Sequence, residues 1–380
     1  MTARDRVLHI GIDARPLSHP HAGGFKSYVR GLVRGLSEAA LPDVQLTLFV
    51  DRPLVPGTAD HLPPDARVVV LSPNRIRADL QEFRRALRRS PVDLLHGTQN
   101  YAPPGTGTPT TVTIHDAFGL RRGPWEAAVR RTPRERFIHG YWKALTRHSA
   151  RTARRVVTIS QASASDLAQT LGLPPERLSV VYNCASVSAD GTRGAERVPG
   201  RILALASPDP RKDPGTLYAA MAALERRLPE AHLSLVCATR ALAERECAAA
   251  ARHGARRVVP VIGPDDAALA HAYATATGFA FPSWAEGFGA PPLEAMAAGC
   301  PVASSSAPAL PEILGSAAVY FTPGDSDACA DALHRLLTDA DLRADLTRRG
   351  RAQAALYSPL RMAQETAAVW RDATRGAGSP

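Results

Sequence analysis

Apolar runs alternate with amphipathic segments along the first half of the chain. Val7–Ile12 is predicted to be a strand, Phe25–Ala39 a helix with one apolar face, and Val44–Val50 the next strand. Val92–His96 is predicted to be a buried strand of a parallel sheet. A regular β-α-β succession predicts a doubly wound α/β sheet. The other predicted segments here are strands at 68–71, 110–115, 156–160 and 178–182, and helices at 80–89, at 136–150 and from 160 to 171.

The length of the chain favours two domains. A chain of 380 residues is longer than one hydrophobic core normally organises. Residues 183–199 are rich in small and polar side chains and are predicted to be the linker. Arg201–Ala206 is then expected to be the first strand of a second sheet.

Several classes of protein are disfavoured. The chain has no apolar run of about eighteen residues, so no membrane-spanning helix is expected. It enters the first predicted strand without a signal-peptide pattern, from which we expect a cytoplasmic location. The cysteines have no ligand-like spacing and are expected to be reduced thiols, with neither metal nor redox chemistry. They are Cys184, Cys237, Cys247, Cys300 and Cys329.

The formal net charge of +10 comes almost entirely from arginine, because lysine occurs only at Lys26, Lys143 and Lys212. The plainest interpretation is a GC-rich genome that places arginine on ordinary surfaces. Arginine clusters at 75–89 and 121–155 are also suited to attract an anionic acceptor, a polyphosphate lipid or an acidic membrane surface. We expect at most peripheral membrane contact. Nucleic acid is not expected, because no aromatic residues alternate with these arginines.

Two glutamates, Glu286 and Glu294, flank a segment rich in glycine and proline. A short helix is predicted to start just after Gly289, since proline suits the first helical turn. Its N-terminus favours anions, and Gly287 and Gly289 allow close approach of a phosphate or sugar. A carboxylate accepts from two neighbouring hydroxyls, so one glutamate is suited to a ribose and the other to a hexose. The alternative is that Glu294 is only a helix-end charge and Glu286 a solvated loop residue.

The flanking segments favour the binding hypothesis. Thr277–Trp284 is a short apolar strand with a proline stop, and Gly299–Ser305 is another short strand. The predicted order is therefore strand, glycine-rich loop, helix, strand. Ligands of open α/β sheets bind at the carboxyl ends of such strands.

This part of the chain resembles the retaining glycosyltransferases of family four, which have the GT-B fold. Residues 281–302 are similar to the donor signature of that family nearly residue for residue, and residues 310–315 resemble the segment that follows. The resemblance implies that the backbone of Phe288, Gly289, Ala290 and Pro291 meets the diphosphate and donor sugar. It also implies that Glu286 binds sugar hydroxyls and that Glu294 binds the ribose.

The same resemblance implies two Rossmann-like, doubly wound parallel-sheet domains that face a central cleft. The expected boundaries are an acceptor-binding domain at 1–185 and a nucleotide-sugar-binding domain at 186–355. Residues 356–380 are expected to hold a helix, at about 361–373, that crosses back to the N-terminal domain.

Three further donor contacts are implied by the family. Gly23 and Gly24 follow the first strand, where the family has a glycine-rich loop facing the donor phosphates; without the family resemblance, a double glycine is more often a simple turn. Lys212 matches the family's diphosphate lysine, whereas Ser207 replaces the usual arginine and Arg211 is expected to compensate. Ile262 lies in the segment whose backbone is expected to hold the nucleotide base.

The acceptor side is expected at strand ends in the first domain. His115 is assigned to the active centre and Asp116 to positioning, because the family carries a His-Asp pair here. His96, Asn100 and Tyr101, which follow the preceding strand, are expected to shape the acceptor side. Their alternative is a turn that simply ends a strand.

The resulting prediction is a hexosyltransferase with Glu286, His115 and Lys212 as catalytic residues. It moves a hexosyl unit from a UDP- or GDP-sugar to an acceptor hydroxyl, with retention and without metal or other cofactor, because Arg211, Lys212 and helix dipoles can neutralise the diphosphate. The expected acceptor is a saccharide, a natural product or a glycolipid, and the oligomeric state is not indicated. The alternatives are an epimerase or hydrolase on the GT-B scaffold, a lipid-linked or cell-envelope glycan mannosyltransferase, and a nucleotide-binding protein without turnover.

Overall fold

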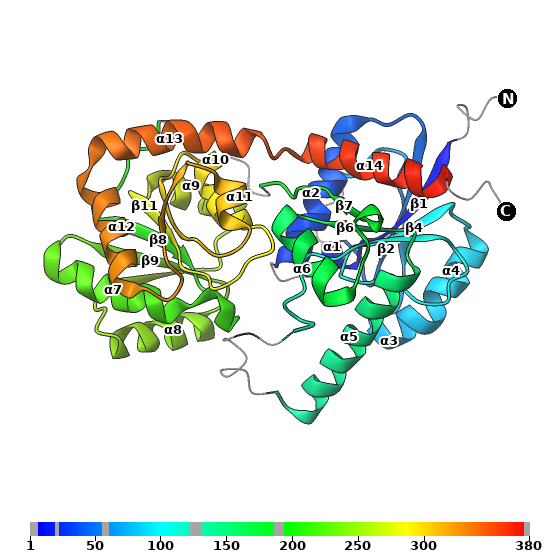
Figure 1. The fold of residues 1–380 in the computed structure, drawn as a ribbon, viewed down its shortest axis with the longest axis horizontal. Helices are drawn as coiled ribbons and strands as arrows, with labels where there is room; N and C mark the ends of the chain where they lie inside the picture. The colour runs from blue at the N-terminus through cyan, green and yellow to red at the C-terminus, as the bar shows by residue number, and fades with distance from the viewer. Residues whose placement is uncertain are drawn as a thin grey trace. The chain divides into compact units, whose positions relative to one another are not determined.

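The computed structural model describes residues 7–19, 23–54, 61–121, 123, 131–185 and 194–375. Its contacts divide the chain into two compact units (Figure 1). Unit 1 contains the described residues up to Gly123, those from 131 to Cys184, and those from Ser358 onward; unit 2 contains Ala185–Tyr357. The predicted linker falls largely on residues 186–193, which lie outside the described residues.

Unit 1 is built on a seven-stranded sheet in which every pair of neighbours is parallel. The strand order is β3-β2-β1-β4-β5-β6-β7. The chain moves outward from β1 in one direction, returns beside it with β4 and continues the other way, which is the doubly wound arrangement predicted from the sequence. The strands are β1 (Leu8–Asp13), β2 (Val44–Val50), β3 (Arg67–Val70), β4 (Leu94–Gly97), β5 (Thr110–Thr113), β6 (Arg155–Thr158) and β7 (Leu178–Val180).

Described helical segments of unit 1 follow β1, β3, β5 and β6, and a last helix follows unit 2 in the sequence. They are α1 (Arg15–Ser18), α2 (Gly24–Ala39), α3 (Arg75–Arg77), the π-helical turn η2 (Ala78–Glu82), α4 (Phe83–Arg89), α5 (Pro133–Thr152), α6 (Gln161–Leu171), the 3₁₀ turn η4 (Pro175–Arg177) and α14 (Pro359–Arg375). The basic helix predicted at 80–89 begins earlier, at Arg75, because the Asn74 side chain accepts from the backbone N–H of Arg77 and caps it.

The last helix, α14, belongs to unit 1 and packs along α2 (Figure 1). Gly35 allows this approach, because a Cβ there would lie 1.9 Å from the carbonyl oxygen of Pro359. At the other end, Arg371 donates to both carboxylate oxygens of Asp43, each at 2.7 Å. These hydrogen bonds lower the pKa of the Asp43 carboxyl. Helix α14 is therefore joined to the rest of unit 1 by close backbone packing and by a bidentate ion pair.

Unit 2 has a six-stranded sheet, again parallel throughout, with the order β10-β9-β8-β11-β12-β13. Its strands are β8 (Arg201–Leu205), β9 (His232–Cys237), β10 (Val258–Ile262), β11 (Gly278–Phe281), β12 (Val302–Ser305) and β13 (Ala318–Phe321). The helical segments are η5 (Pro210–Lys212), α7 (Pro214–Arg227), α8 (Arg240–Arg252), α9 (Asp266–Thr275), α10 (Ala290–Ala297), α11 (Leu310–Leu314), α12 (Ser326–Thr338) and α13 (Ala340–Ala355). The prediction of two Rossmann-like parallel sheets is confirmed.

The hydrophobic cores lie between each sheet and its covering helices. In unit 2, buried residues of β8 and β9 pack with α7 and α12, among them Leu233, Met221 and Leu333. Smaller clusters in unit 1 centre on Phe49 with Phe83 and on Val112 with Leu167. Among the described residues, no helix is long and apolar enough to cross a membrane.

Candidate active site

Lys212 and Glu286 lie together in unit 2. Lys212 ends η5, which follows β8, and Glu286 lies in the loop after β11, the strand paired with β8. The Lys212 Nζ is 2.6 Å from the Glu286 Oε1 and 5.3 Å from the centroid of the Phe281 ring. Both side chains keep part of their surface exposed. A partly solvated cation and a carboxylate therefore meet at the carboxyl ends of adjacent parallel strands.

The loop before Lys212 is held by its own polar groups. The backbone N–H of Asp209 donates to the Ser207 Oγ at 3.2 Å. The Asp209 carboxylate accepts from the Arg211 Nε at 2.9 Å and from its Nη2 at 2.6 Å. Burial opposes ionisation of Asp209, but the hydrogen bonds and charge of Arg211 lower its carboxyl pKa overall. Ser207 thus shapes the loop, and Arg211 is paired with Asp209 in this structure.

The helix predicted just after Gly289 is confirmed as α10, which begins at Ala290. Gly289 has φ +98°, and a Cβ there would lie 2.5 Å from Leu310 Cδ2. Glycine is therefore required by the left-handed backbone and by the packing of Leu310. Glu294 lies in the second turn of α10, where it is 6% exposed, rather than in the first turn. Ala290 and Pro291 are partly exposed at the helix start, whereas Phe288 is buried against Tyr357.

Tyr273 contacts Glu294 and was not expected from the sequence. Its hydroxyl, on α9, donates to the Glu294 Oε2 at 3.3 Å, and its ring is fully buried. Burial and the carboxylate raise the pKa of the Tyr273 phenol, so it stays a donor. A tyrosine within an alanine-rich helix carries no sequence signal for this role. The predicted base-binding residue, Ile262, lies at the exposed end of β10.

If Glu294 binds the donor ribose, as the family resemblance implies, removing the Tyr273 hydroxyl is expected to weaken donor binding without slowing the chemical step. A net hydrogen bond contributes about 0.5–1.5 kcal/mol, so Tyr273→Phe should raise KM for the nucleotide sugar about 2- to 12-fold while kcat stays unchanged. Steady-state kinetics with varied donor measures this. Tyr320→Phe, which removes a hydroxyl bonded to the Gly315 carbonyl in the same unit, is the matched control. A fall in kcat with constant KM would contradict the assigned role.

His115 lies just beyond β5 in unit 1. The strand predicted at 110–115 ends at Thr113, because the backbone N–H of His115 donates to the Asn100 Oδ1 at 2.8 Å instead of to a neighbouring strand. The imidazole packs edge-on to Phe25 and Tyr28, with centroids 4.9 and 4.6 Å away. Its Nε2 is 3.0 Å from the carbonyl oxygen of Thr98.

These contacts define the protonation of His115. A carbonyl oxygen only accepts, so Nε2 carries the proton and Nδ1 is left as an acceptor. Burial lowers the pKa of His115 to about 4, and the ring is neutral at pH 7. His115 therefore offers a hydrogen-bond acceptor, not a positive charge.

His96 and His115, both buried, are expected to make unit 1 sensitive to acid. Burial lowers the pKa of His96 to about 3 as well, whereas a histidine in the unfolded chain has a pKa near 6.5. Because the unfolded state binds these protons first, stability present above about pH 6.5 is lost as pH falls toward about 4. The slope is up to about 1.4 kcal/mol per pH unit for each histidine. Denaturant unfolding from pH 7.5 to 4.5 measures it, and His115→Asn should reduce the slope; an unchanged slope would contradict the prediction.

The four residues expected on the acceptor side have different environments. His96 is fully buried, with Nδ1 2.9 Å from Thr111 Oγ1 and its ring against Trp370. Tyr101 is 1% exposed and donates to the Asp79 carboxylate. Asn100 holds the backbone of His115, and Asp116 accepts from the backbone N–H of Phe118. His96 and Tyr101 thus present no surface to an acceptor in this structure; their buried positions support the strand ends around His115.

Gly23 and Gly24 lie at the exposed start of α2. Gly23 has φ 172°, an extended backbone open to any residue, and a Cβ at either position would meet nothing within 4 Å. The backbone here faces open space, which suits the approach of a ligand but does not by itself require glycine.

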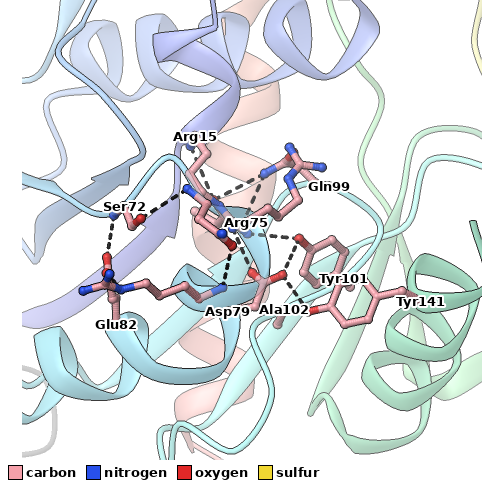
Figure 2. Close-up of polar contacts among 12 residues, drawn as sticks. Arg15, Ser72, Arg75, Asp79, Glu82, Gln99, Tyr101, Ala102 and Tyr141 are labelled. Carbon is pink, nitrogen blue, oxygen red and sulfur yellow. Dashed lines mark hydrogen bonds and ion pairs between the residues drawn. The ribbon is translucent and has the colours of Figure 1, made fainter. Parts of the chain in front are cut away.

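A buried polar cluster in unit 1 was not picked out from the sequence (Figure 2). The Arg15 guanidinium donates to Asp13 at 2.6 and 2.8 Å and to Asp79 at 2.8 Å. The hydroxyls of Tyr101 and Tyr141 both donate to Asp79 Oδ2 at 3.0 Å. Although burial works against its charged form, Asp13 and Asp79 raise the pKa of Arg15. The Asp-x-Arg sequence at the end of the first predicted strand was the available signal.

Comparison with known proteins agrees with this architecture. Residues 22–189 match the family model described as Glycosyltransferase Family 4, and residues 199–339 match the model described as Glycosyl transferases group 1. The chain is 33% identical to an MMP alpha-(1->4)-mannosyltransferase of Mycolicibacterium hassiacum over 75% of this chain and 72% of that protein. It is 28% identical to O-antigen chain mannosyltransferase B of Escherichia coli, over 72% of each chain.

Solved structures share the fold. Sucrose-phosphate synthase of Thermosynechococcus elongatus superposes with a TM-score of 0.73 at 21% identity, covering 98% of this chain and all of that one. The Anabaena protein HepE, in complex with UDP and glucose, gives a TM-score of 0.71 at 17% identity over 96% of this chain and 100% of that one. With two parallel Rossmann-like sheets, both family models and a full-length likeness to these structures, the chain belongs to the family 4, group 1 glycosyltransferases of the GT-B fold.

Proposed function

We propose that this glycosyltransferase moves a hexosyl unit, a mannosyl unit in the first instance, from a nucleotide diphosphate sugar to an acceptor hydroxyl, with retention of configuration. The observation that carries the proposal is the Lys212–Glu286 pair at the carboxyl ends of β8 and β11. The mannosyl preference rests on relatives described as mannosyltransferases. GDP- and UDP-sugars both remain candidate donors.

We assign the diphosphate to Lys212. A leaving nucleoside diphosphate gains negative charge as the glycosidic bond breaks, and a positioned cation stabilises that charge more in the transition state than in the ground state. Lys212 is partly exposed and already close to the site of bond cleavage, if Glu286 binds the sugar as proposed. Arg211 adds a second cation once the diphosphate competes with Asp209 for its guanidinium. With these cations we propose a reaction without metal or other cofactor.

Glu286 and Glu294 are assigned separate hydroxyl groups. Glu286 carries an ion pair with Lys212, which favours a role in orienting sugar hydroxyls over one as a covalent nucleophile. Retention is then proposed through front-face attack, in which the acceptor hydroxyl gives its proton to the departing phosphate oxygen. Glu294, fixed by Tyr273, is assigned to the ribose. His115, neutral and with Nδ1 as acceptor, is assigned to a substrate hydroxyl.

The test is a screen of purified protein with GDP-mannose, GDP-glucose, UDP-glucose and UDP-galactose. Binding is measured by calorimetry, and nucleoside diphosphate release is followed with and without saccharide, glycolipid and natural-product acceptors, in the presence of EDTA. We expect slow donor hydrolysis alone, faster release with one acceptor class, and a product of unchanged anomeric configuration by NMR. Full-rate donor breakdown without acceptor would support an epimerase or hydrolase instead, and binding without turnover would support a nucleotide-binding protein.

A further inference from the structure

We propose that Arg75 forms an anion-binding subsite in unit 1, suited to an acceptor that carries a phosphate or carboxylate near its reactive hydroxyl. The proposal rests on the proposed function only in identifying the bound molecule as the acceptor. Binding of an anion at Arg75 is tested independently of sugar transfer. The observation that carries it is that Arg75 is a partly exposed residue whose guanidinium is held by a neutral amide and an indole, beside the residues that position His115.

Arg75 is held in place without being neutralised. Its Nη2 donates to the Gln99 Oε1 at 3.0 Å, and its guanidinium carbon lies 5.2 Å from the centroid of the Trp142 ring. No carboxylate among the described residues forms an ion pair with it. Its neighbour Arg77, by contrast, pairs with Glu82 at 2.8 Å. A guanidinium has five N–H donors, so one bond to Gln99 leaves most of its fork for a planar or tetrahedral anion.

The amide that holds Arg75 is itself hydrogen-bonded to the buried cluster, whose residues Arg15, Asp79, Tyr101 and Tyr141 are drawn with Gln99 in Figure 2. Gln99 is 7% exposed, and its Nε2 lies 3.4 Å from each Asp13 oxygen. Trp142 follows Tyr141, whose hydroxyl is bonded to Asp79. Trp142 itself is 37% exposed, so part of its apolar surface is open beside the cation. Sugar rings commonly present an apolar face as well as hydroxyls, so this pair fits a charged saccharide.

The position of Gln99 connects this cation with the candidate active site. Thr98, one residue before it, accepts from His115 Nε2, and Asn100, one residue after it, accepts from the His115 backbone N–H. Segment 98–100 therefore contacts His115 on one side and, through the Gln99 side chain, Arg75 on the other. An anion on Arg75 would lie at the same edge of the sheet as the imidazole.

A competing interpretation is that Arg75 only balances the buried cluster. Asp13 and Asp79 carry two negative charges against the single positive charge of Arg15. In that case the charge of Arg75 stabilises the folded protein through its attraction to these carboxylates, and Arg75 binds no ligand. The experiment must therefore separate a change in anion affinity from a change in folding.

The test uses the full chain and four probes, namely inorganic phosphate, mannose 6-phosphate, glucuronate and neutral mannose, with affinity measured by calorimetry. We expect mannose 6-phosphate to bind more tightly than mannose. Charge-assisted hydrogen bonds contribute about 1.5–3 kcal/mol, so Arg75→Gln should weaken its binding about 10- to 150-fold. Arg77→Gln, two residues away on the same segment, is the matched control and should change nothing. The comparison of phosphate with glucuronate shows which anion the site prefers.

Two further measurements distinguish binding at Arg75 from binding in the donor site and from a change in folding. Lys212→Ala should leave mannose 6-phosphate binding intact; loss of that binding in Lys212→Ala but not in Arg75→Gln would place the probe in the donor site and overturn the proposal. A lower melting temperature in Arg75→Gln with unchanged probe affinity would assign Arg75 to charge balance and also overturn it. Binding of GDP and UDP should be unaffected by Arg75→Gln, so a failure of this subsite is distinguishable from a failure of the proposed transfer reaction.

Discussion

Lys212→Ala is expected to lower kcat/KM for sugar transfer by about 10²- to 10³-fold while the fold survives. This is the usual effect of removing one preorganised group that stabilises developing charge. Glu286→Ala should have an effect of similar size, because it removes the proposed sugar contact and also the carboxylate 2.6 Å from the Lys212 Nζ. The measurement is the initial rate of nucleoside diphosphate release in the presence of acceptor, with circular dichroism to confirm folding.

The structure provides a control and a diagnostic for this pair. Arg227 and Asp331 form an exposed ion pair in the same unit, and Arg227→Ala should leave turnover unchanged. If Lys212 and Glu286 act on one bound donor, the double variant Lys212→Ala/Glu286→Ala should lose much less than the product of the two single losses. Near-normal turnover in either single variant would remove that residue from the catalytic machinery.

The fold could be predicted from the sequence because its signal is local and repeated. The strand predicted at Val44–Val50 is β2, with the same bounds in the structure. The helix predicted at 25–39 is α2, which begins one residue earlier. Strand ends were less accurate. His115 was placed inside a strand, but a side-chain amide from Asn100, fifteen residues away, takes its backbone N–H. A contact of that kind leaves no trace in the alternation of apolar residues.

The donor half of the candidate site was more accessible to prediction than the acceptor half. Glycine and proline around Gly289 encode the start of α10 directly, because backbone conformation depends on those residue types. The proximity of Lys212 to Glu286 could be expected only from the family resemblance, since 74 residues separate them in the sequence. On the acceptor side, a side chain must be exposed to contact an acceptor. The sequence does not show that His96 and Tyr101 are buried, because their burial follows from tertiary packing. Tyr273 was missed for the same reason, and Arg75 was noted only as one member of the arginine cluster at 75–89.

Arg15→Met is expected to lower the free energy of unfolding of unit 1 by about 3–5 kcal/mol. Removing one partner of a buried ion pair leaves the other charge without compensation, and here two carboxylates would be left. Arg15 is 1% exposed and Asp13 and Asp79 are 0% exposed, so water cannot replace the guanidinium without opening the structure. Because methionine approximately preserves the volume of the side chain, the loss of stability would come from the missing charge and not from a cavity.

The measurement is denaturant unfolding followed by a probe in unit 1, because a chain of two units need not unfold in one step. Arg34→Ala, which removes an exposed ion pair with Glu38 in the same unit, should cost less than about 1 kcal/mol. Adding Asp79→Asn to Arg15→Met should restore part of the loss, since the neutral amide removes one uncompensated charge and can still accept from Tyr101 and Tyr141. A loss in Arg15→Met no larger than that in Arg34→Ala would contradict the prediction. Because Gln99 and Tyr141 belong to the same network, Arg15→Met should also weaken mannose 6-phosphate binding at Arg75, and adding Asp79→Asn should restore part of that binding.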